Sequence, residues 1–396
     1  MHNDPTARAP AAARPAPPAP IWPDAPRADL WFPYMNWAHT HANRTPCALS
    51  QSGMPPADPA FLEGLVRAQD LDHPTREALP ALEEALSRRF RVPRSRVIVT
   101  VGATGGMFLA AAHWLRAGAR VVTETPSYEP FRALPRFFGA DVALVERRPE
   151  ERWTLNQERV RAALARGSGP GHVFVANPNN PTGVLADRGA VAALAREAER
   201  AGGVLVSCDI YMEYVPRAEQ AFAFECAPNA VSIGSLTKAY GLGALRIGWI
   251  VLGEALASAK DALVDIAYLS YVDPPTASMN AAIAALARTE ALLAPLRVVE
   301  AESRPIFEGW LRTTPGIECT IPSRGIIAFP RVDGVADTLA LAEFLVREHQ
   351  VDVVPGEFFA QAGHVRIGCG MPAERLREGL ARLERGIRAF RGSRAG

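Results

Sequence analysis

Lysine is almost absent from this sequence, and one of its two copies stands in an unusual setting. Of the 43 lysine and arginine residues, only Lys238 and Lys260 are lysines. Lys238 lies in the stretch SLTKAYGLGALRIGW, residues 235–249, among small, aromatic and basic neighbours. A lysine amine that is partly buried among cations can lose its proton and attack a carbonyl to form an imine, which a permanently protonated arginine cannot do. We therefore predict that Lys238 is a nucleophile.

A second group of residues is suited to binding a phosphate. The apolar run RVIVTV is followed by GATGG, residues 102–106, and then by the helical pattern MFLAAAHWL. Such a turn leaves free N–H groups at a helix N-terminus, with Thr104 as a hydroxyl donor, and this combination binds anions. By itself GATGG is equally compatible with ordinary turn chemistry before a helix. The stretch around the lysine adds two hydroxyls and a second cation: Ser235, Thr237 and Arg246.

Three further motifs place polar side chains directly after apolar runs. SYEPF carries Tyr128, NPNNPTG carries Asn180, and SCDIYMEY carries Asp209 and Tyr211. Taken singly, Tyr128 fits an ordinary half-buried tyrosine and NPNNPTG fits a plain loop. Together with the lysine and the phosphate-binding residues they supply a stacking ring, a neutral donor, a carboxylate and an imine-forming amine. These are the groups that pyridoxal phosphate needs.

The motifs follow short apolar segments that have the pattern of strands in one sheet. From about residue 96, helical stretches alternate with the runs RVIVTVG, RVVTETP, DVALVE, HVFVAN, GVLVSCD, AVSIGS and RIGWIVL. We predict an α/β fold with a mostly parallel seven-stranded sheet and helices on both faces. One intervening helix is expected between Asp187 as N-cap and Gly202. Ligands bind at the carboxyl ends of such strands, so the motifs are expected to meet at one edge.

The pattern changes near residue 300 and predicts a second, smaller α/β unit. Residues 281–312 have the pattern of a long helix, and short strands follow in GIIAFPRV, VDVVPG and HVRIGCG, closed by the helix AERLREGLARLERGIRAF. Extended pieces before residue 60 are expected to join this layer. We therefore predict a large cofactor-binding domain at 58–298 and a small domain from 28–57 and 299–396. Aromatic residues at 31–37 would form a docking strand or cover a substrate.

Composition excludes several other classes of protein. A net charge of +1 and a hydrophobic fraction of 48% describe an ordinary globular protein, so neither nucleic acid nor a membrane is an expected partner. Five cysteines without a Cys-x-x-Cys pair argue against a disulfide framework and a zinc site, and no metal is expected. No membrane-spanning run or signal peptide is evident, so we expect a cytoplasmic protein. The Pro/Ala-rich residues 1–27 are expected to form a disordered tail.

Taken in order along the chain, these motifs resemble those of the class I/II aminotransferases, which are fold-type I pyridoxal-phosphate enzymes. The resemblance covers residues 45 to 390 and rests on GATGG, PSYEPF, NPNNPTG, SLTKAYGLGALRIGW and VPGEFFAQAGHVRIG. It implies pyridoxal 5'-phosphate as the cofactor and a small-molecule L-α-amino acid as the substrate. It also implies a homodimer whose two subunits share their active sites.

The resemblance implies a role for each matching residue. Lys238 would hold the cofactor as an imine and then move the α-proton as base and acid. Tyr128 would stack on the pyridine ring, while Asn180 and Tyr211 would hydrogen-bond its phenolic oxygen. Arg366, in HVRIG, would bind the substrate carboxylate through its planar fork, beside Asn180. The cofactor phosphate would be bound by Ala103, Thr104, Ser235, Thr237 and Arg246.

One departure from the family pattern concerns the residue that supports the ring nitrogen. The family reads Asp-x-x-Tyr, whereas here Cys208 stands three residues before Tyr211 and Asp209 only two before it. A carboxylate at this place keeps the nitrogen protonated, so that the ring accepts electrons when the Cα–H bond breaks. We expect Asp209 to reach the nitrogen through a one-residue deletion in the following turn, and to act with Lys238 and Tyr211 in catalysis. If Cys208 occupies the position instead, simple transamination is disfavoured.

Other departures bear on the substrate and on the partner subunit. His73 stands where the family has a tyrosine that reaches the neighbouring subunit's cofactor phosphate. Asp273 stands at an asparagine of the aspartate-type members, and Leu269 at their arginine for a distal carboxylate, so aspartate and glutamate are not expected as preferred substrates. Asp273 suits a cationic or hydroxylated side chain, or is simply an N-cap or loop carboxylate. Gly53 lies in ALSQSGMPP, which replaces an early Gly-x-Pro element, and we assign it to substrate binding.

Two functional hypotheses follow from the resemblance. The first is a pyridoxal-phosphate-dependent aminotransferase that passes the amino group of an L-α-amino acid to a 2-oxo acid. The second uses the same cofactor for β/γ-elimination, replacement or carbon–carbon bond formation in a specialised pathway, and ALSQSGMPP weakly resembles a branch of the family that performs elimination and ring closure. A ligand-sensing regulator on this fold would need a DNA-binding module, which the Pro/Ala-rich tail does not supply.

Overall fold

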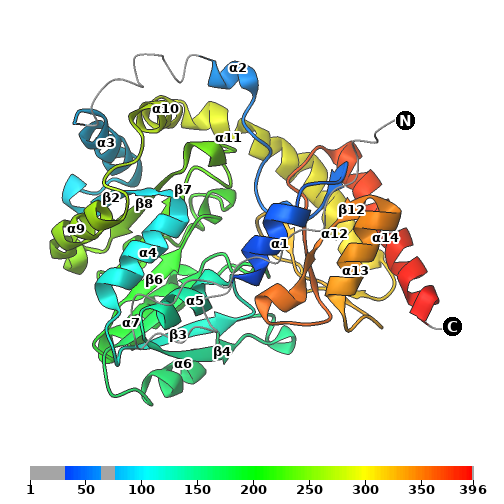
Figure 1. Cartoon of the computed structure of the whole chain (residues 1–396), viewed down its shortest axis with the longest axis horizontal. Helices are drawn as coiled ribbons and strands as arrows, with labels where there is room; N and C mark the ends of the chain where they lie inside the picture. Colours follow the sequence, from blue (N-terminus) through cyan, green and yellow to red (C-terminus); the bar gives the residue numbers. More distant parts are fainter. Residues whose placement is uncertain (1–31, 64–75, 395–396) are drawn as a thin grey trace, which may run out of the picture.

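A seven-stranded sheet forms the centre of the computed structural model, which describes residues 32–63 and 76–394 (Figure 1). Its strand order is β2-β8-β7-β6-β5-β3-β4, and only β8 runs antiparallel to its neighbours. The predicted mostly parallel sheet is therefore confirmed. The strands are β2 (Val97–Val101), β3 (Arg120–Thr125), β4 (Asp141–Glu146), β5 (Gly171–Ala176), β6 (Leu205–Cys208), β7 (Ala230–Ser235) and β8 (Ile247–Leu252).

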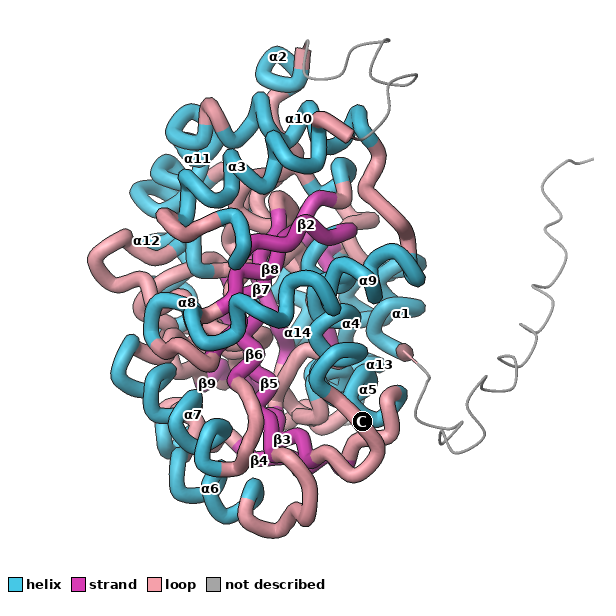
Figure 2. The backbone as a smooth tube through the Cα atoms, turned by 90° about the vertical axis from the view of Figure 1, so that its left-hand side faces the viewer, coloured by secondary structure: helices cyan, strands magenta, loops and turns pink. Residues whose placement is uncertain are grey.

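Helices cover both faces of this sheet, as Figure 2 shows. One side, which we call the α4 face, carries α4 (Gly102–Trp114), α5 (Pro130–Phe137) and α9 (Lys260–Ser270). The other side, the α7 face, carries α6 (Gln157–Leu164), α7 (Arg188–Arg200) and α8 (Ala223–Cys226). Because successive strand residues point to opposite sides, Leu205 of β6 packs in the core of the α7 face, whereas Val206 and Cys208 pack in that of the α4 face.

The helix predicted from its caps is present as α7. Asp187 accepts a hydrogen bond from the backbone N–H of Ala190 at 2.8 Å, which satisfies one of the free donors of the first turn. Val191 and Leu194 are buried on its inner side. Gly202, at φ +72°, follows the last turn and adopts the left-handed conformation typical of a helix end.

The C-terminal part forms the smaller layer. Its strands are short, and β13 and β10 pair on either side of β14. The predicted helix 281–312 is interrupted after Leu286 and again by a π-helical turn at 299–303. The elements are α10 (Thr276–Leu286), α11 (Thr289–Val298), α12 (Arg304–Thr313), β9 (Ile317–Glu318), β10 (Ile327–Ala328), β11 (Arg331–Val332), α13 (Thr338–Phe344), β12 (Val351–Asp352), β13 (Val354–Pro355), β14 (Val365–Gly368) and α14 (Ala373–Arg394).

An early segment of the chain joins this late layer, as predicted. Strand β1 (Cys47–Ala48) pairs in parallel with β12, with Cys47 opposite Val351. The expected strand at 31–37 is wrong where the structure describes it, because Pro33 opens a helix, α1 (Pro33–His41), between the sheet and the C-terminal layer (Figure 1). The remaining helices are α2 (Pro59–Leu62) and α3 (Ala78–Phe90). The domain boundaries near residues 58 and 298 stay a prediction.

The predicted tail 1–27 lies outside the described residues. Within the residues that are described, no helix has both the length and the apolar character needed to cross a membrane. The same residues contain no cluster of three histidine, cysteine, aspartate or glutamate side chains that would hold a metal ion. All five cysteines are free thiols.

Candidate active site

Lys238 lies just beyond the carboxyl end of β7, and its amine has a single hydroxyl partner. Its Nζ donates a hydrogen bond to Oγ of Ser52 at 2.9 Å. Burial lowers the pKa of Lys238 to about 8, and the positive charges of Arg366 and Arg246 act in the same direction. At pH 7 about one molecule in ten then has a neutral amine, whereas an ordinary lysine has fewer than about one in a thousand. Lys238, which the sequence predicts to be a nucleophile, therefore has an amine that readily loses its proton.

A cavity of about 320 Å³ lies next to this amine. Three segments that are distant in sequence line it: helix α1, the segment 50–54, and the stretch that carries Lys238. Arg366 of β14 completes the wall. The cavity is large enough for a small molecule, and it lies where the N-terminal helix, the sheet edge and the C-terminal layer meet.

Gly53 packs directly against the lysine. A Cβ placed on Gly53 would lie 3.2 Å from the backbone oxygen of Lys238 and 3.3 Å from its Cδ, which is tighter than an ordinary contact. The next residue, Met54, donates its N–H to the same backbone oxygen at 2.8 Å. The structure therefore brings Gly53 into the site and explains why this position suits a residue without a side chain.

The predicted phosphate-binding residues also come together, at the N-terminus of α4. Gly102 begins that helix at φ +67°, and a Cβ there would collide with the guanidinium of Arg246. Ala103 and Thr104 supply the next N–H groups of the first turn, and these have no partner within a helix. Ser235 ends β7 and Thr237 follows it, with its N–H directed to the Ser235 hydroxyl at 3.4 Å. Together these groups form a concentrated anion-binding surface.

Arg366 is fully buried, and it joins three parts of the chain. Its Nη1 donates to the side-chain oxygen of Asn180 at 3.1 Å, and its Nη2 donates to the hydroxyl of Tyr34 at 3.2 Å and to the carbonyl of Ser50 at 3.1 Å. Its Nε has no partner among the described residues, although only 1% of the residue is exposed. A buried guanidinium with an unused donor in a cavity wall can bind a carboxylate.

Two predicted tyrosines lie at the same edge of the sheet. Tyr128 directs its hydroxyl to the sulfur of Met35, and its ring packs edge-on against Tyr34 with 6.0 Å between the ring centres. The hydroxyl of Tyr211 is buried and lacks a well-formed hydrogen bond within the described residues. Burial raises the pKa of Tyr211 to about 12, so it stays protonated. An unpaired buried hydroxyl is rare, and here it fits the oxygen of a bound ligand.

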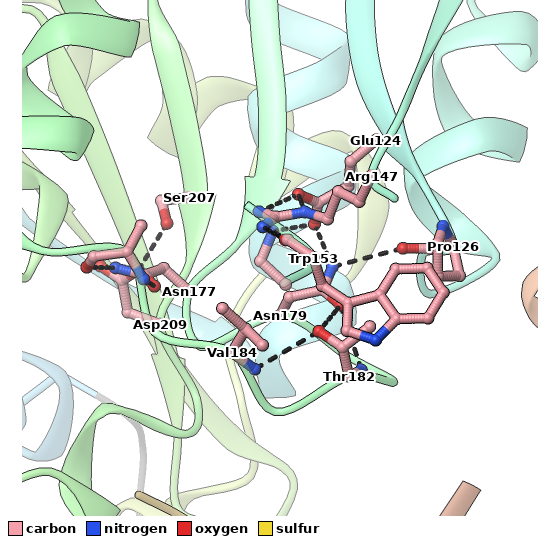
Figure 3. Close-up of polar contacts among 12 residues, drawn as sticks. Glu124, Pro126, Arg147, Trp153, Asn177, Asn179, Thr182, Val184, Ser207 and Asp209 are labelled. Carbon is pink, nitrogen blue, oxygen red and sulfur yellow. Dashed lines mark hydrogen bonds and ion pairs between the residues drawn. The ribbon is translucent and has the colours of Figure 1, made fainter. Parts of the chain in front are cut away.

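A buried ion pair fixes the loop that presents Asn180 (Figure 3). The carboxylate of Glu124 accepts two hydrogen bonds from Arg147, at 2.8 and 2.6 Å, and one from Nδ2 of Asn179 at 2.8 Å. The side-chain oxygen of Asn179 in turn accepts from the N–H and hydroxyl of Thr182. Both sides of the turn are therefore tied to the end of β3, which holds Asn180 in place.

The structure corrects the expectation that Asp209 joins this group. Its carboxylate accepts a hydrogen bond from Ser207 at 2.5 Å (Figure 3). It also accepts from the hydroxyl of Ser232 and from the N–H of Ala223 at 3.1 Å, and Ala223 belongs to the core of the α7 face. Burial raises the pKa of Asp209 to about 7, and the two serines partly offset this effect. The alternation of β6 continues into residue 209, so Asp209 shares the side of Ser207 rather than that of Cys208.

One other predicted residue, Asp273, is not brought to the lysine in this chain. Asp273 follows α9 near Tyr271 and does not line the cavity. His73 lies outside the described residues. Conversely, sequence reasoning missed Ser52 and the role of Tyr34. Ser52 carries no recognisable signal. The aromatic cluster around Tyr34 is visible in the sequence, where it predicts a docking strand or a cover over the substrate; Tyr34 lies in the cavity wall, on a helix.

Comparison with known proteins identifies the family. A model of the family described as aminotransferase class I and II matches residues 69–383. The chain belongs to this family. Class I and II aminotransferases depend on pyridoxal phosphate, so this chain is a pyridoxal-phosphate-dependent aminotransferase-like enzyme. The buried Tyr211 hydroxyl, the lowered pKa of Lys238 and the anion-binding N-terminus of α4 fit that cofactor.

Individual relatives agree with the assignment to this family. Capreomycidine synthase of Streptomyces vinaceus is 34% identical over 80% of this chain and 81% of its own. Aspartate/prephenate aminotransferase of Thermus thermophilus is 30% identical over 78% of this chain and 81% of its own. A solved pyridoxal-phosphate-dependent aminotransferase from Streptococcus suis, 23% identical, shares the fold with a TM-score of 0.81 over 93% of this chain and 99% of its own.

Proposed function

We propose that the enzyme transfers the amino group of an L-α-amino acid to a 2-oxo acid in the Lys238 cavity. The observation that carries this proposal is the pairing of a readily deprotonated amine with a buried guanidinium in one cavity wall. Such a pair can hold an amino acid by its carboxylate and place its Cα beside a base. Bound pyridoxal phosphate supplies the electron sink that makes the Cα–H bond acidic.

Each remaining side chain acts on one part of this arrangement. Lys238 attaches the cofactor and, once released by the substrate amine, accepts the α-proton at its Nζ and returns it. Arg366 binds the substrate carboxylate through its fork, and Asn180 orients that fork from the other side. Tyr128 would cover the ring, and Tyr211 would donate its hydroxyl to the phenolic oxygen. The phosphate is held by Ala103, Thr104, Ser235, Thr237 and Arg246.

Ser52 and Gly53 determine the position of the Lys238 side chain and of the main chain that packs on it. The Ser52 hydroxyl accepts the amine hydrogen bond and keeps Nζ directed into the cavity. Gly53 allows the main chain of segment 50–54 to lie directly on Lys238, so that a substrate is enclosed between this segment and the sheet edge.

A homodimer completes the substrate pocket in this proposal. Three large apolar side chains near the end of α9 are exposed in the single chain: Tyr268 at 52%, Leu269 at 89% and Val272 at 59%. Burial of this surface against a second copy would bring Asp273 towards the partner's cavity. Leu269 stands where aspartate-type members carry an arginine for a distal carboxylate, so we propose neutral, hydroxylated or cationic amino acids as substrates.

A reducing compartment, such as the cytoplasm, is the proposed location. All five thiols are free, and Cys47, Cys208 and Cys369 are buried. Proteins that retain several unpaired cysteines suit an environment that keeps thiols reduced.

The first experiment combines spectroscopy with product analysis. Purified enzyme is mixed with a panel of amino acids, while the cofactor absorbance and the appearance of 2-oxo acid are followed. Transamination predicts one equivalent of 2-oxo acid per active site in the absence of an acceptor. The variant K238A should neither attach the cofactor covalently nor react. A covalent cofactor adduct in K238A would overturn the assignment.

Two observations favour a second candidate function, elimination or ring closure at the same site. Capreomycidine synthase is 34% identical over most of both chains. In addition, Asp209 is held on the far side of the sheet from the cofactor residues. Released ammonia or a cyclised product without any 2-oxo acid would favour this function over transamination.

A mixed-variant assay tests whether the two subunits of the proposed homodimer share their active sites. Subunits that are inactivated separately, one by K238A and the other by H73A, should regain part of the activity when they are combined.

A further inference from the structure

We propose that the thiol of Cys208 faces the ring nitrogen of pyridoxal phosphate, so that this nitrogen remains unprotonated in the working enzyme. The proposal rests on the proposed cofactor site around Lys238 and adds a residue to it. It differs from the usual arrangement of the family, in which a carboxylate holds the nitrogen in its protonated form.

The first argument comes from the two faces of the sheet. Val206 and Cys208 of β6 lie on the α4 face, as do Val231 and Ile233 of β7. By the same alternation Ser235 lies on that face, next to the N-terminus of α4. A cofactor whose phosphate occupies that helix terminus therefore lies on the side of the sheet to which Cys208 belongs.

The second argument comes from the neighbours of the thiol. Cys208 interacts electrostatically with Lys238, Tyr128 and Tyr211, and each of these lies at the cavity edge of the sheet. These three residues are the ones proposed to surround the ring. Cys208 is itself buried, with 2% of its surface exposed. The thiol is therefore enclosed within the proposed ring site.

The third argument is that Asp209 is held away from the ring. Its two carboxylate oxygens accept three hydrogen bonds, from Ser207, Ser232 and the N–H of Ala223. The carboxylate of Glu225, which interacts electrostatically with Asp209, belongs to α8 on the α7 face. To reach the α4 face, the carboxylate would have to break all three hydrogen bonds and leave the hydroxyl protons of Ser207 and Ser232 without their present acceptor. The serines thus fix the direction of Asp209.

A thiol and a carboxylate have opposite effects on a ring nitrogen. A carboxylate accepts a full N–H bond and stabilises the positive charge, whereas a neutral thiol is only a weak donor and brings no negative charge. Burial raises the pKa of Cys208 to about 12, so the thiol keeps its proton and the nitrogen gains none. A neutral ring withdraws fewer electrons from the substrate. Negative charge then stays nearer Cα, where it favours reaction at the substrate side chain over transfer of the amino group.

The experiment measures the protonation of the nitrogen directly. Wild-type enzyme, C208D and C208S are each loaded with pyridoxal phosphate labelled with ¹⁵N in the ring, and the ¹⁵N chemical shift is recorded from pH 6 to 8. We expect wild type and C208S to give the shift of a neutral pyridine. C208D should move the signal upfield to the value of a pyridinium. The variant D209N is the matched control and should resemble wild type.

The possible outcomes separate the two proposals. A pyridinium shift in wild type, lost in D209N, would assign the nitrogen to Asp209 and overturn the Cys208 proposal alone. A pyridinium shift that persists in D209N and C208S would overturn it as well. If wild type and K238A give the same shift as free pyridoxal phosphate, the cofactor site itself is wrong and both proposals fail. C208S and D209N keep the test decisive if the buried carboxylate of C208D prevents folding.

Discussion

Replacement of Arg147 by methionine tests whether a buried ion pair holds the Asn180 loop. The Arg147 side chain is 3% exposed and its partner Glu124 is 0% exposed. In R147M, Glu124 would keep its hydrogen bonds from Asn179 and from the N–H of Ala176, but it would lose its arginine partner and two hydrogen bonds. The carbonyl of Trp153 would also lose the donor that now lies at 2.6 Å.

The expected cost follows from the burial of the remaining charge. Removal of one partner from a buried ion pair typically destabilises a protein by about 3–5 kcal/mol, because an uncompensated charge is left in the interior. At about 2 °C per kcal/mol for a large domain, Tm should fall by about 6–10 °C. The assay is thermal unfolding followed by circular dichroism, with all variants at equal cofactor saturation. The KM for the amino acid should also rise, since Asn180 loses its support.

The adjacent residue provides a matched control. Arg148 pairs with Glu146 at 2.9 Å, but the two side chains are 44% and 55% exposed, so R148M should leave Tm within about 1 °C of wild type. The double variant E124Q/R147M removes both charges and should recover part of the loss seen in R147M. Equal Tm values for R147M and R148M, or a double variant less stable than R147M, would refute the reasoning.

Three further predictions concern the site. The rate of pyridoxal phosphate uptake by the apo-enzyme should rise with pH and level off above about pH 8, because the amine of Lys238, with a pKa of about 8, is then mostly deprotonated. A rate that continues to rise up to pH 10 would contradict this. G102A places a Cβ against the Arg246 guanidinium at φ +67°, so titrations should show an affinity about tenfold weaker for pyridoxal phosphate but unchanged for pyridoxal. R366K should raise KM at least about tenfold with a smaller effect on kcat, because lysine lacks the fork; steady-state kinetics showing an unchanged KM would remove Arg366 from the carboxylate site.

The sheet and the edge motifs were predictable because their signals are local. Each strand is a short β-branched run closed by a turn or a helix start, and α7 carries its own cap at Asp187. Parallel strands in one sheet then require the motifs that follow them to meet at one edge. The proximity of Lys238, the α4 terminus and the Asn180 loop follows from topology alone.

Contacts between distant parts of the chain have no local signal in the sequence. Tyr34 and Arg366 are 332 residues apart, and Ser52 and Lys238 are 186 apart. Nothing in the sequence near either partner specifies these pairs, because they depend on how the N-terminal helix and the C-terminal layer pack. The direction of Asp209 is predictable from the alternation of β6 and agrees with the spacing to Tyr211; the expectation that Asp209 reaches the ring rests only on the chemical need for a carboxylate.

The pairing of β1 with β12 has a consequence for how the chain is made. Ser50 donates its N–H to the carboxylate of Asp352, 302 residues later. At about 5–20 residues per second, the ribosome needs about 15–60 seconds to supply that partner. The strands of the central sheet emerge in the meantime and can associate with one another. The early segment 47–54 therefore has no partner strand for most of synthesis. The cavity lined by Ser52 and Arg366 can form only when synthesis is nearly complete.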